Sequence, residues 1–516
     1  MSPVSEILLP LAIAVPIVAA TLPIACGRRF DTVGWPVAAL TTTTVVAMAG
    51  TVAREVYLTG PFDHELGGYA PPIVIELVAD EFSAAVFVLV ALVSAATLVF
   101  ARVVGPRRNT FYSAYLLLTG GLVGVSLTGD LFNLFVFLEI VGLTTYALIA
   151  ADRSGASAYA SLKYLVVGTV GASLYLTGVG YVFLATGTLN MADVSTQLSA
   201  VGYTDPLVQT GYALIAVGFA LKMALFPVHT WQPDAYQRAP DAVTTVVAAL
   251  VSTVSAYALL RVSYSVFTVD FLAANDAITT GILVVSGVSI LAGSALAAMQ
   301  SDLKRMFAYS SVAQFGLIAA TVGLATETAL LGGIVHLLGH GLLKFGLFLG
   351  IGLLAAGYGV RHVADLASLA RDAPLASGSL AVLALALVGI PPSIGFLGKW
   401  YVALGAVEAG GTTGGIGGIA IAAVVFVSTL FTLAYVARVL ERLYFAGVDR
   451  SIPVVHEIGA VPDGGAGPPP VTESRSRVPV APLVVLVVTA IAAVGLGFAG
   501  AGFEALLDPF LTEVFA

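Results

Sequence analysis

Six ionisable side chains lie within otherwise apolar stretches of the sequence: Glu139, Lys222, His336, His340, Lys344 and Lys399. The stretch GFALKMALFPVHTW, residues 218–231, places Lys222 among residues that suit the interior of a lipid bilayer. A cation at mid-bilayer costs at least about 2.5–3.5 kcal/mol on insertion scales, so residues of this kind are usually functional. Of the five lysines, only Lys163 and Lys304 are assigned to polar loops.

The chemistry that these residue types share is proton transfer. Burial disfavours the charged form of a lysine and a nearby carboxylate favours it, so movement of the carboxylate would switch the lysine between binding and releasing a proton. Histidine can relay protons between such groups near neutral pH. The spacing of four residues between the two histidines and Lys344 predicts one stripe along a helix. The predicted proton path contains, in order, Lys222, a water, His340, Lys344 and Lys399.

Each of these residues also has a structural alternative. Either histidine alone could be a hydrogen-bonded residue of the core, and Glu139 could form a purely structural ion pair with Lys222. Lys399 could extend to the membrane interface, and Lys344 could pack against a helix end. The functional interpretation is favoured because all of these residues carry an insertion penalty together. In that interpretation, Glu139 gates the path by its pairing with Lys222.

The elements that must position these residues are membrane-spanning helices. Hydrophobic residues make up 58% of the 516-residue chain and charged residues 10%, and the mean hydropathy is +0.98. A soluble protein of this length would need a far more charged surface. Recurring apolar stretches of about 20 residues therefore predict an all-α, polytopic membrane protein with about fourteen spans. The predicted spans are 7–26, 34–53, 82–104, 111–129, 131–151, 160–186, 211–231, 242–264, 277–299, 307–325, 328–357, 378–408, 416–444 and 480–502.

Composition also excludes several kinds of site. Cys26 is the only cysteine, which excludes an intramolecular disulfide, a cysteine-ligated zinc and a cysteine-ligated iron–sulfur cluster. The sequence has no Gly-rich loop of the Walker type, so nothing indicates ATP as the energy source. We therefore expect no cofactor, no metal and no nucleic acid, with the lipid bilayer as the surrounding medium.

Basic residues alternate from loop to loop. Arg107 and Arg108 follow the third span, for example, whereas the acidic Asp63 and Glu65 follow the second. By the positive-inside rule, the loops after odd-numbered spans are cytoplasmic. The first span is interpreted as a retained helix, because a basic n-region and a clear cleavage site are missing. We predict a multi-pass protein of the plasma membrane with both termini outside.

Two predicted spans contain prolines that would interrupt them. Pro227 and Pro233 lie at the end of the seventh span, and Pro391 and Pro392 lie in the twelfth, within GIPPSIGFLGKWY. Broken helices in lipid need partners for the freed carbonyls, and a pair of them in two halves indicates a transporter site, although a packing kink is the alternative. The separation by five spans predicts two repeats of five helices. The predicted division is 1–110 for the first three helices, 111–264 and 277–444 for the repeats, 449–479 for a flexible cytoplasmic loop and 480–516 for the last helix and tail.

Further polar residues follow the break in the seventh span: His229, Asp234, Arg238 and Asp241. They are expected at the cytoplasmic mouth of that helix. They could form an inlet for protons or a network of loop contacts, and the structural alternative is preferred for Arg238.

Five motifs fall within roughly residues 80–445: TGDLFNLFVFLEI, ALKMALFPVHTWQPDAY, SDLKRMFAYSSVAQFGLI, HLLGHGLLKFGLFL and GIPPSIGFLGKWY. Together they resemble the proton-translocating antiporter-like subunits of complex I, membrane-bound hydrogenases and Mrp-type multisubunit cation/proton antiporters. The segment GDLFNLFVFLE is most similar to the D-type subunit of Mrp antiporters. The resemblance implies fourteen helices with inverted five-helix repeats, broken helices seven and twelve, and partner subunits. It also implies functional roles for Glu139, Lys222, His340, Lys344 and Lys399.

The chain departs from that family at two places. Family members often carry a lysine or histidine in helix eight, within a pattern such as LLTKVGVYALLR, where this chain has Thr253 in LVSTVSAYALLR. A threonine can bridge to water but cannot carry the charge. The pattern APTPVSALL is replaced by APDAVTTVV, with Asp241 and Ala242, so hydration near this helix start differs.

Four functions were weighed. The first is a proton-translocating subunit of a multisubunit Na⁺/H⁺ antiporter, with protons and Na⁺ as its ions and other antiporter subunits as partners. The second is the proton-pumping module of a redox complex, either a hydrogenase or a complex I relative. The third is a membrane partner in inorganic-carbon uptake. A structural scaffold is disfavoured by the buried charge, and the resemblance to the Mrp D-type subunit favours the antiporter.

Overall fold

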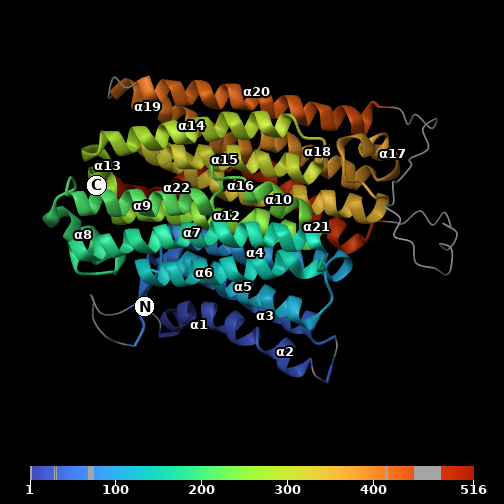
Figure 1. Cartoon of the computed structure of the whole chain (residues 1–516), viewed down its shortest axis with the longest axis horizontal. Coiled ribbons are helices and arrows are strands. Elements are labelled where there is room, and N and C mark those ends of the chain that lie inside the picture. Colours follow the sequence, from blue (N-terminus) through green and yellow to red (C-terminus); the bar gives the residue numbers. More distant parts are fainter. Residues whose placement is uncertain (1–2, 28, 31, 68–74, 413–415, 447–477) are drawn as a thin grey trace.

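A bundle of long, nearly parallel helices makes up the protein in a computed structural model (Figure 1). The structure describes all residues except 1–2, 28, 31, 68–74, 413–415 and 447–477. The predicted cytoplasmic loop 449–479 lies almost wholly outside the described residues. Twelve described helices are long and apolar enough to cross a membrane, and two shorter apolar helices accompany them. The chain is therefore a multi-pass, all-helical membrane protein, as predicted, while the count of fourteen spans and the inverted repeats stay predictions.

The first part of the chain alternates long helices with short connections. Its helices are α1 (Pro3–Ala19), α2 (Leu22–Cys26), α3 (Gly34–Thr59), α4 (Glu81–Val104), α5 (Asn109–Leu127), α6 (Leu131–Ile149), η1 (Ala150–Asp152), α7 (Gly155–Thr186) and α8 (Met191–Val201). Between α3 and α4, β1 (Phe62–Glu65) and β2 (Glu76–Ala79) form an antiparallel hairpin that the sequence analysis did not predict. Asp80 ends this hairpin and caps α4, because its carboxylate accepts a hydrogen bond from the backbone N–H of Ser83 at 2.8 Å.

The middle of the chain contains the first interrupted span. Its helices are α9 (Pro206–Lys222), α10 (Trp231–Arg238), α11 (Asp241–Val246), η2 (Val247–Val251), α12 (Ser252–Arg261), η3 (Val262–Val266), α13 (Thr268–Ala274), α14 (Asp276–Ala298) and α15 (Leu303–Leu324). The segments η2 and η3 are π-helical stretches on either side of α12. Such stretches interrupt the regular helical bonding and are frequent at functional sites.

The last part contains the second interrupted span. Its helices are α16 (Glu327–Tyr358), η4 (Val363–Leu366), α17 (Leu369–Asp372), α18 (Pro374–Val388), α19 (Ile394–Thr412), α20 (Ile416–Tyr444), α21 (Val480–Gly495), η5 (Leu496–Phe498) and α22 (Gly500–Phe515). Both predicted breaks are present, since α9 ends at Lys222 before α10, and α18 ends at Val388 before α19. The tail after the last span is the helix α22.

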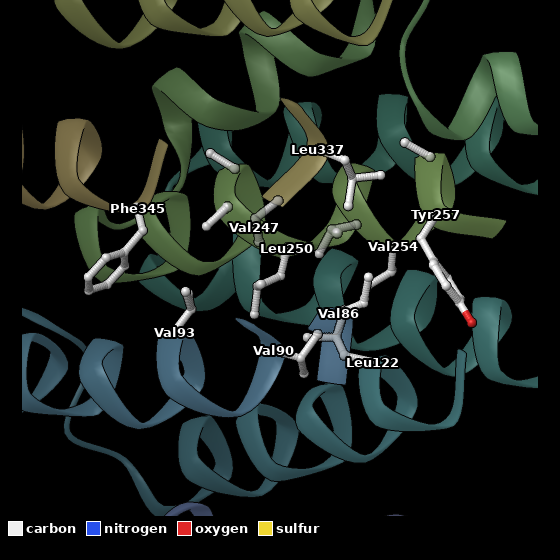
Figure 2. Packing of buried hydrophobic residues seen from close by; sticks show 14 of the residues in the cluster. Val86, Val90, Val93, Leu122, Val247, Leu250, Val254, Tyr257, Leu337 and Phe345 are labelled. Carbon is white, nitrogen blue, oxygen red and sulfur yellow. The ribbon is translucent and has the colours of Figure 1, made fainter. Parts of the chain in front are cut away.

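The helices are held together by apolar side chains that are shielded from solvent and lipid. Figure 2 shows this packing where α4 and α5 meet η2, α12 and α16. Val86, Leu122, Leu250 and Leu337 are all fully buried there. Without a hydrophobic driving force in lipid, close packing of this kind and buried hydrogen bonds keep membrane helices together.

Two expectations from the sequence concern the ends of the bundle. The N and C marks both lie at the left of Figure 1, with α8 and α13, whereas α17 lies at the right. The two termini thus share one end of the bundle, while the side of the membrane stays a prediction. The assignment of Lys163 and Lys304 to polar loops was wrong: Lys163 lies within α7, and Lys304 lies in the first turn of α15. Polar neighbours in the sequence concealed both helix starts.

Candidate proton-transfer site

The Glu139 carboxylate and the Lys222 ammonium form a close ion pair between α6 and α9. Lys222 Nζ donates to Glu139 Oε1 at 2.9 Å, and the Lys222 side chain is only 6% exposed. Lys222 is the last residue of α9, where the free carbonyls of a helix end favour a positive charge. Glu139 is a quarter exposed, and both residues line a small cavity with Tyr175 and Phe219. The contact expected from the sequence is therefore present.

Side chains from three other elements hold the break that follows Lys222. The backbone N–H of Phe226 donates to Ser289 Oγ of α14 at 3.1 Å, and Trp231 Nε1 of α10 donates to the Leu221 carbonyl at 3.0 Å. The hydroxyl of Ser252 in α12 donates to the Lys222 carbonyl at 3.4 Å. The polar groups freed by the break are thus bonded to protein, as the membrane interior requires.

A second group of ionisable residues, here named the His–Lys cluster, consists of His336, His340, Lys344 and Lys399. Its α16 members face α15. Lys344 is fully buried and donates to the Phe307 carbonyl at 2.6 Å and to Ser310 Oγ at 2.5 Å. His336 Nε2 lies 2.8 Å from Gln314 Oε1. The uncharged partners Ser310 and Gln314 were missed in the sequence, although their spacing of four in AYSSVAQFG marks one face of α15.

His340 differs from its neighbours because neither ring nitrogen has a hydrogen-bond partner among the residues that the structure describes. The residue is only 1% exposed. Its ring packs edge-on against Phe315, with centroids 5.0 Å apart, and lies 6.2 Å from the ring of His336. Buried nitrogens normally find a partner, often an ordered water. Both nitrogens of His340 are therefore available to a bound water.

Lys399 binds the end of the second broken helix. Its Nζ donates to the carbonyls of Leu387 and Val388, both at 2.9 Å, which are the last two residues of α18. Lys399 lies on α19, beyond the break, and is 8% exposed, so it does not extend to a membrane interface. It is within electrostatic range of His336, His340 and Lys344. No carboxylate among the described residues forms an ion pair with the His–Lys cluster.

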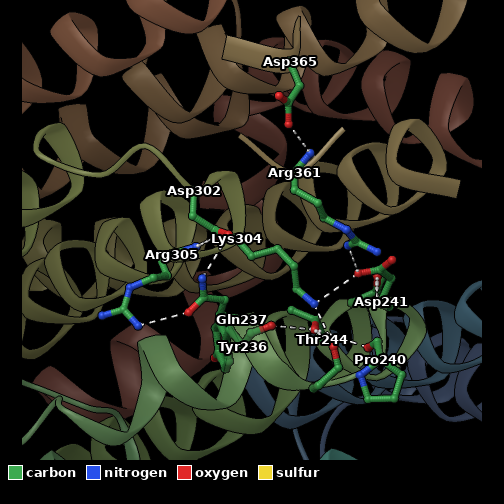
Figure 3. Close-up of polar contacts among 12 residues, drawn as sticks. Tyr236, Gln237, Pro240, Asp241, Thr244, Asp302, Lys304, Arg305, Arg361 and Asp365 are labelled. Atoms are coloured by element: carbon green, nitrogen blue, oxygen red, sulfur yellow. Dashed lines mark hydrogen bonds and ion pairs between the residues drawn. The ribbon is translucent and has the colours of Figure 1, made fainter. Parts of the chain in front are cut away.

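The polar residues at the predicted cytoplasmic mouth form ion pairs (Figure 3). Asp241 Oδ1 accepts from Lys304 Nζ at 3.1 Å and from Arg361 Nη1 at 2.8 Å. Asp234, which is not labelled there, binds Lys163 and Arg305, each at 2.7 Å. Both carboxylates connect helices distant in sequence, which favours the network of loop contacts over the inlet for these two residues.

His229 and Thr253 were the other two candidates near this mouth. His229 is 6% exposed and lies in the break, with its ring 5.2 Å from Phe226 and 5.8 Å from Tyr309. Its Nδ1 has no partner in the described part of the chain. Thr253 Oγ1 donates to the Ala249 carbonyl at 2.7 Å, so its hydroxyl bonds back to the middle of the π-helical stretch η2.

An apolar wall lies where α16 meets η2 and α12. Val247, Leu250 and Val254 of η2 and α12 contact it together with Leu337 (Figure 2). In the described part of the chain, no protein hydrogen bond joins Lys222 to His340. Transfer between the ion pair and the His–Lys cluster therefore needs water or a movement of side chains. No group of three or more His, Cys, Asp or Glu that could hold a metal ion occurs among the described residues.

Comparison with known proteins places this geometry among related membrane proteins. A family model described as NADH:quinone oxidoreductase/Mrp antiporter, transmembrane, matches residues 128–431. The N-type subunit of the NADH-quinone oxidoreductase of Desulforudis audaxviator is 40% identical over 88% of this chain and 87% of its own. The D-type subunit of the Na⁺/H⁺ antiporter of Bacillus subtilis is 29% identical over 87% of each chain. A chain in the structure of the Mrp complex from a Dietzia species is similar with a TM-score of 0.84 and 27% identity, over 100% of both chains.

Proposed function

Because the chain belongs to the NADH:quinone oxidoreductase/Mrp antiporter transmembrane family, we propose that it carries protons as a subunit of a multisubunit monovalent cation/proton antiporter. Membership makes it a proton-translocating, antiporter-like subunit. The finer assignment to Na⁺/H⁺ exchange is supported by the similarity to the D-type antiporter subunit and to the Mrp complex. Its partners are then the other subunits of that complex.

The observation that carries the proposal is the Glu139–Lys222 pair at the end of a broken helix. A lysine with a carboxylate at 2.9 Å is held in its charged form. When the carboxylate moves away, burial disfavours the charge, and the proton leaves for a nearby acceptor. His340 is available as such an acceptor through water, and Lys344 and Lys399 continue the path. Glu139 therefore acts as the gate, and the roles of all these residues are part of the proposal.

Proton flux in everted membrane vesicles tests the assignment. The chain is expressed with its neighbouring gene products in cells that lack other Na⁺/H⁺ antiporters and complex I. Addition of NaCl to energised vesicles should release the pH gradient, and Glu139→Ala or Lys222→Ala should abolish that release while assembly persists. Transport at the wild-type rate by either variant contradicts the role of the pair. Lys163→Ala, at a partly exposed pair, is the control and should keep transport.

The second candidate is the proton-pumping module of a redox complex, which the 40% identity to an N-type subunit of a quinone oxidoreductase favours. This chain would then depend on electron transfer in partner subunits. The same vesicles distinguish the two functions. Proton movement that follows an electron donor and ignores Na⁺ would support the redox complex, whereas a response to Na⁺ without electron transfer supports the antiporter.

A further inference from the structure

A cavity of about 260 Å³ with a mixed polar and apolar lining opens at the end of the bundle that holds both termini. The hairpin, α8, η3 and α22 each contribute to its wall. A water molecule takes about 30 Å³ in the liquid, so the cavity has room for several. Its polar lining includes Glu76, Asp80, Thr128, Ser195, Arg261 and Glu513. None of these residues belongs to the Glu139–Lys222 ion pair or to the His–Lys cluster.

Arg261 and Asp80 form a buried ion pair in the wall of this cavity. Arg261 Nη2 lies 2.5 Å from Asp80 Oδ2, and the residues are 8% and 6% exposed. The guanidinium also lies 5.5–5.9 Å from the centroids of three aromatic rings, those of Phe82, Tyr257 and Phe510. Phe510 belongs to α22, so the last helix helps to fix the cation. A guanidinium remains protonated in proteins, so Arg261 and Asp80 form a permanent pair of opposite, mutually compensating charges.

Two oxygens near the Arg261–Asp80 pair have no hydrogen-bond partner among the described residues. They are Thr268 Oγ1, which belongs to the cavity lining, and Oε2 of Glu81, a residue that is 3% exposed. Glu81 is within electrostatic range of Asp80, Arg261 and Glu513. Buried polar oxygens without protein partners are normally bonded to water. The two oxygens are therefore bonding sites for water beside the Arg261–Asp80 pair.

Arg261 also lies between the cavity and the middle of the bundle. Thr253, Tyr257 and Arg261 are separated by four residues each within α12, so they share one stripe of that helix. Arg261 Nε donates to the Tyr257 hydroxyl at 3.3 Å, and that hydroxyl donates to the Ser126 carbonyl at 2.8 Å. Further inward, the stripe meets the apolar wall around Val254 (Figure 2). On this stripe, Arg261 lines the cavity, and Tyr257 and Thr253 lie deeper along the helix.

We propose that this cavity is an aqueous vestibule and that Arg261, held in place by Asp80, sets its ion selectivity. The acidic Glu76 and Glu513 attract cations to the mouth, while the guanidinium of Arg261, fixed by Asp80 and the three rings, closes the inner end to hydrated cations. The inference rests on the proposed transport function, because it assigns the barrier that keeps such a path from leaking.

Reaction of introduced cysteines with a charged thiol reagent tests the vestibule. Ser265→Cys and Ser263→Cys are each introduced into the complete complex that also carries Cys26→Ser. Ser265 lines the cavity, whereas Ser263, two residues away on η3, is fully buried. A reagent added from the face that holds the termini should modify the first variant and leave the second unmodified. Equal protection of both variants would overturn an aqueous vestibule. This measurement requires no transport, so it is independent of the outcome for the proposed function.

Passive ion leak through the reconstituted complex tests the barrier. With no driving gradient of protons, Arg261→Gln should raise the efflux of ²²Na⁺ at least about tenfold, while Arg261→Lys keeps the charge and the low leak. Asp80→Asn removes the partner that holds the guanidinium, so its leak should rise as well, by a smaller factor than in Arg261→Gln. Wild-type leak in assembled Arg261→Gln would overturn the assignment. If Arg261→Gln does not assemble, a leak through Arg261→Lys decides against the barrier.

Discussion

The Glu139–Lys222 ion pair and the His–Lys cluster hold their lysines by different means. Lys222 faces the carboxylate of Glu139, whereas Lys344 and Lys399 are bound only by carbonyl and hydroxyl oxygens. A carboxylate strongly favours the charged lysine, while neutral oxygens discriminate less between the charged and neutral forms. Under the proposed function, the first region would retain a proton until its partner moves, and the second would pass the proton on.

The helix breaks support this difference. Lys222 ends the helix that is broken, so its position depends on α9 and on the partner in α6. Lys399 lies beyond its break and reaches back to the carbonyls that the break exposes. Both arrangements place a cation at the negative end of a half-helix. Only the first adds a movable countercharge, and the predictions below test whether that addition decides the function.

Loss of the lysine in the ion pair should have the largest effect. Lys222→Ala should reduce transport to background, because it removes the proton carrier and leaves Glu139 without its partner. The double variant Glu139→Gln/Lys222→Ala removes both charges and should recover any assembly lost in the single variant, since an unpaired buried charge is the destabilising element. It should not recover transport. Vesicle flux and native gels measure the two quantities, and recovered transport in the double variant would show that the pair is purely structural.

Loss of a lysine from the His–Lys cluster should separate stability from transport. Lys344→Met removes a fully buried ammonium that has no carboxylate partner, so we expect an unchanged or higher melting temperature of the detergent-solubilised complex. Transport should still fall at least about tenfold, as is typical when a proton-transfer group is removed. A parallel fall in melting temperature and in the amount of assembled complex would instead indicate a packing role. The control Lys163→Met changes a lysine at a partly exposed pair.

A carboxylate introduced into the His–Lys cluster should make it resemble the ion pair. Gln314→Glu places an acid 2.8 Å from His336, where it would favour the protonated imidazole. His336 would then retain its proton. Transport should slow several-fold, because release of that proton becomes the slow step. The rate of flux across a pH series measures this effect. Gln314→Ala is the matched control, and equal slowing in both variants would mean that the lost hydrogen bond is the cause.

The sequence was sufficient for those features that depend on local composition. The all-helical membrane fold follows from repeated apolar stretches, and both breaks follow from prolines within them. The Glu139–Lys222 contact was also expected, since each residue alone would be costly in lipid. Lys304 was misassigned because its partner Asp241 is distant in the chain and its neighbours are polar. The partners of Lys399 were beyond prediction because they are carbonyls that exist as free acceptors only after α18 ends.

Short elements outside the predicted spans were also missed. The hairpin strands FDHE and ELVA have only four residues each, too few for a recognisable alternation. The helix α22 was assigned to a tail, although its Phe510 packs against Phe82 with ring centroids 5.4 Å apart. Such contacts depend on tertiary packing, which local pattern does not encode.

The smallest expected effect is that of introducing a lysine into α12, at Thr253. Thr253→Lys introduces the residue type that related proteins often have there, between the ion pair and the His–Lys cluster. If water bridges this region, the ammonium can replace the water, and transport should stay within about twofold of wild type. The Thr253 hydroxyl now bonds only to its own helix, so little hydrogen bonding is lost. Vesicle flux at matched expression measures the rate, with Thr253→Met as an uncharged control of similar length. Loss of assembly in the lysine variant alone would show that this position is dry and packed, and that the two regions exchange protons by another route.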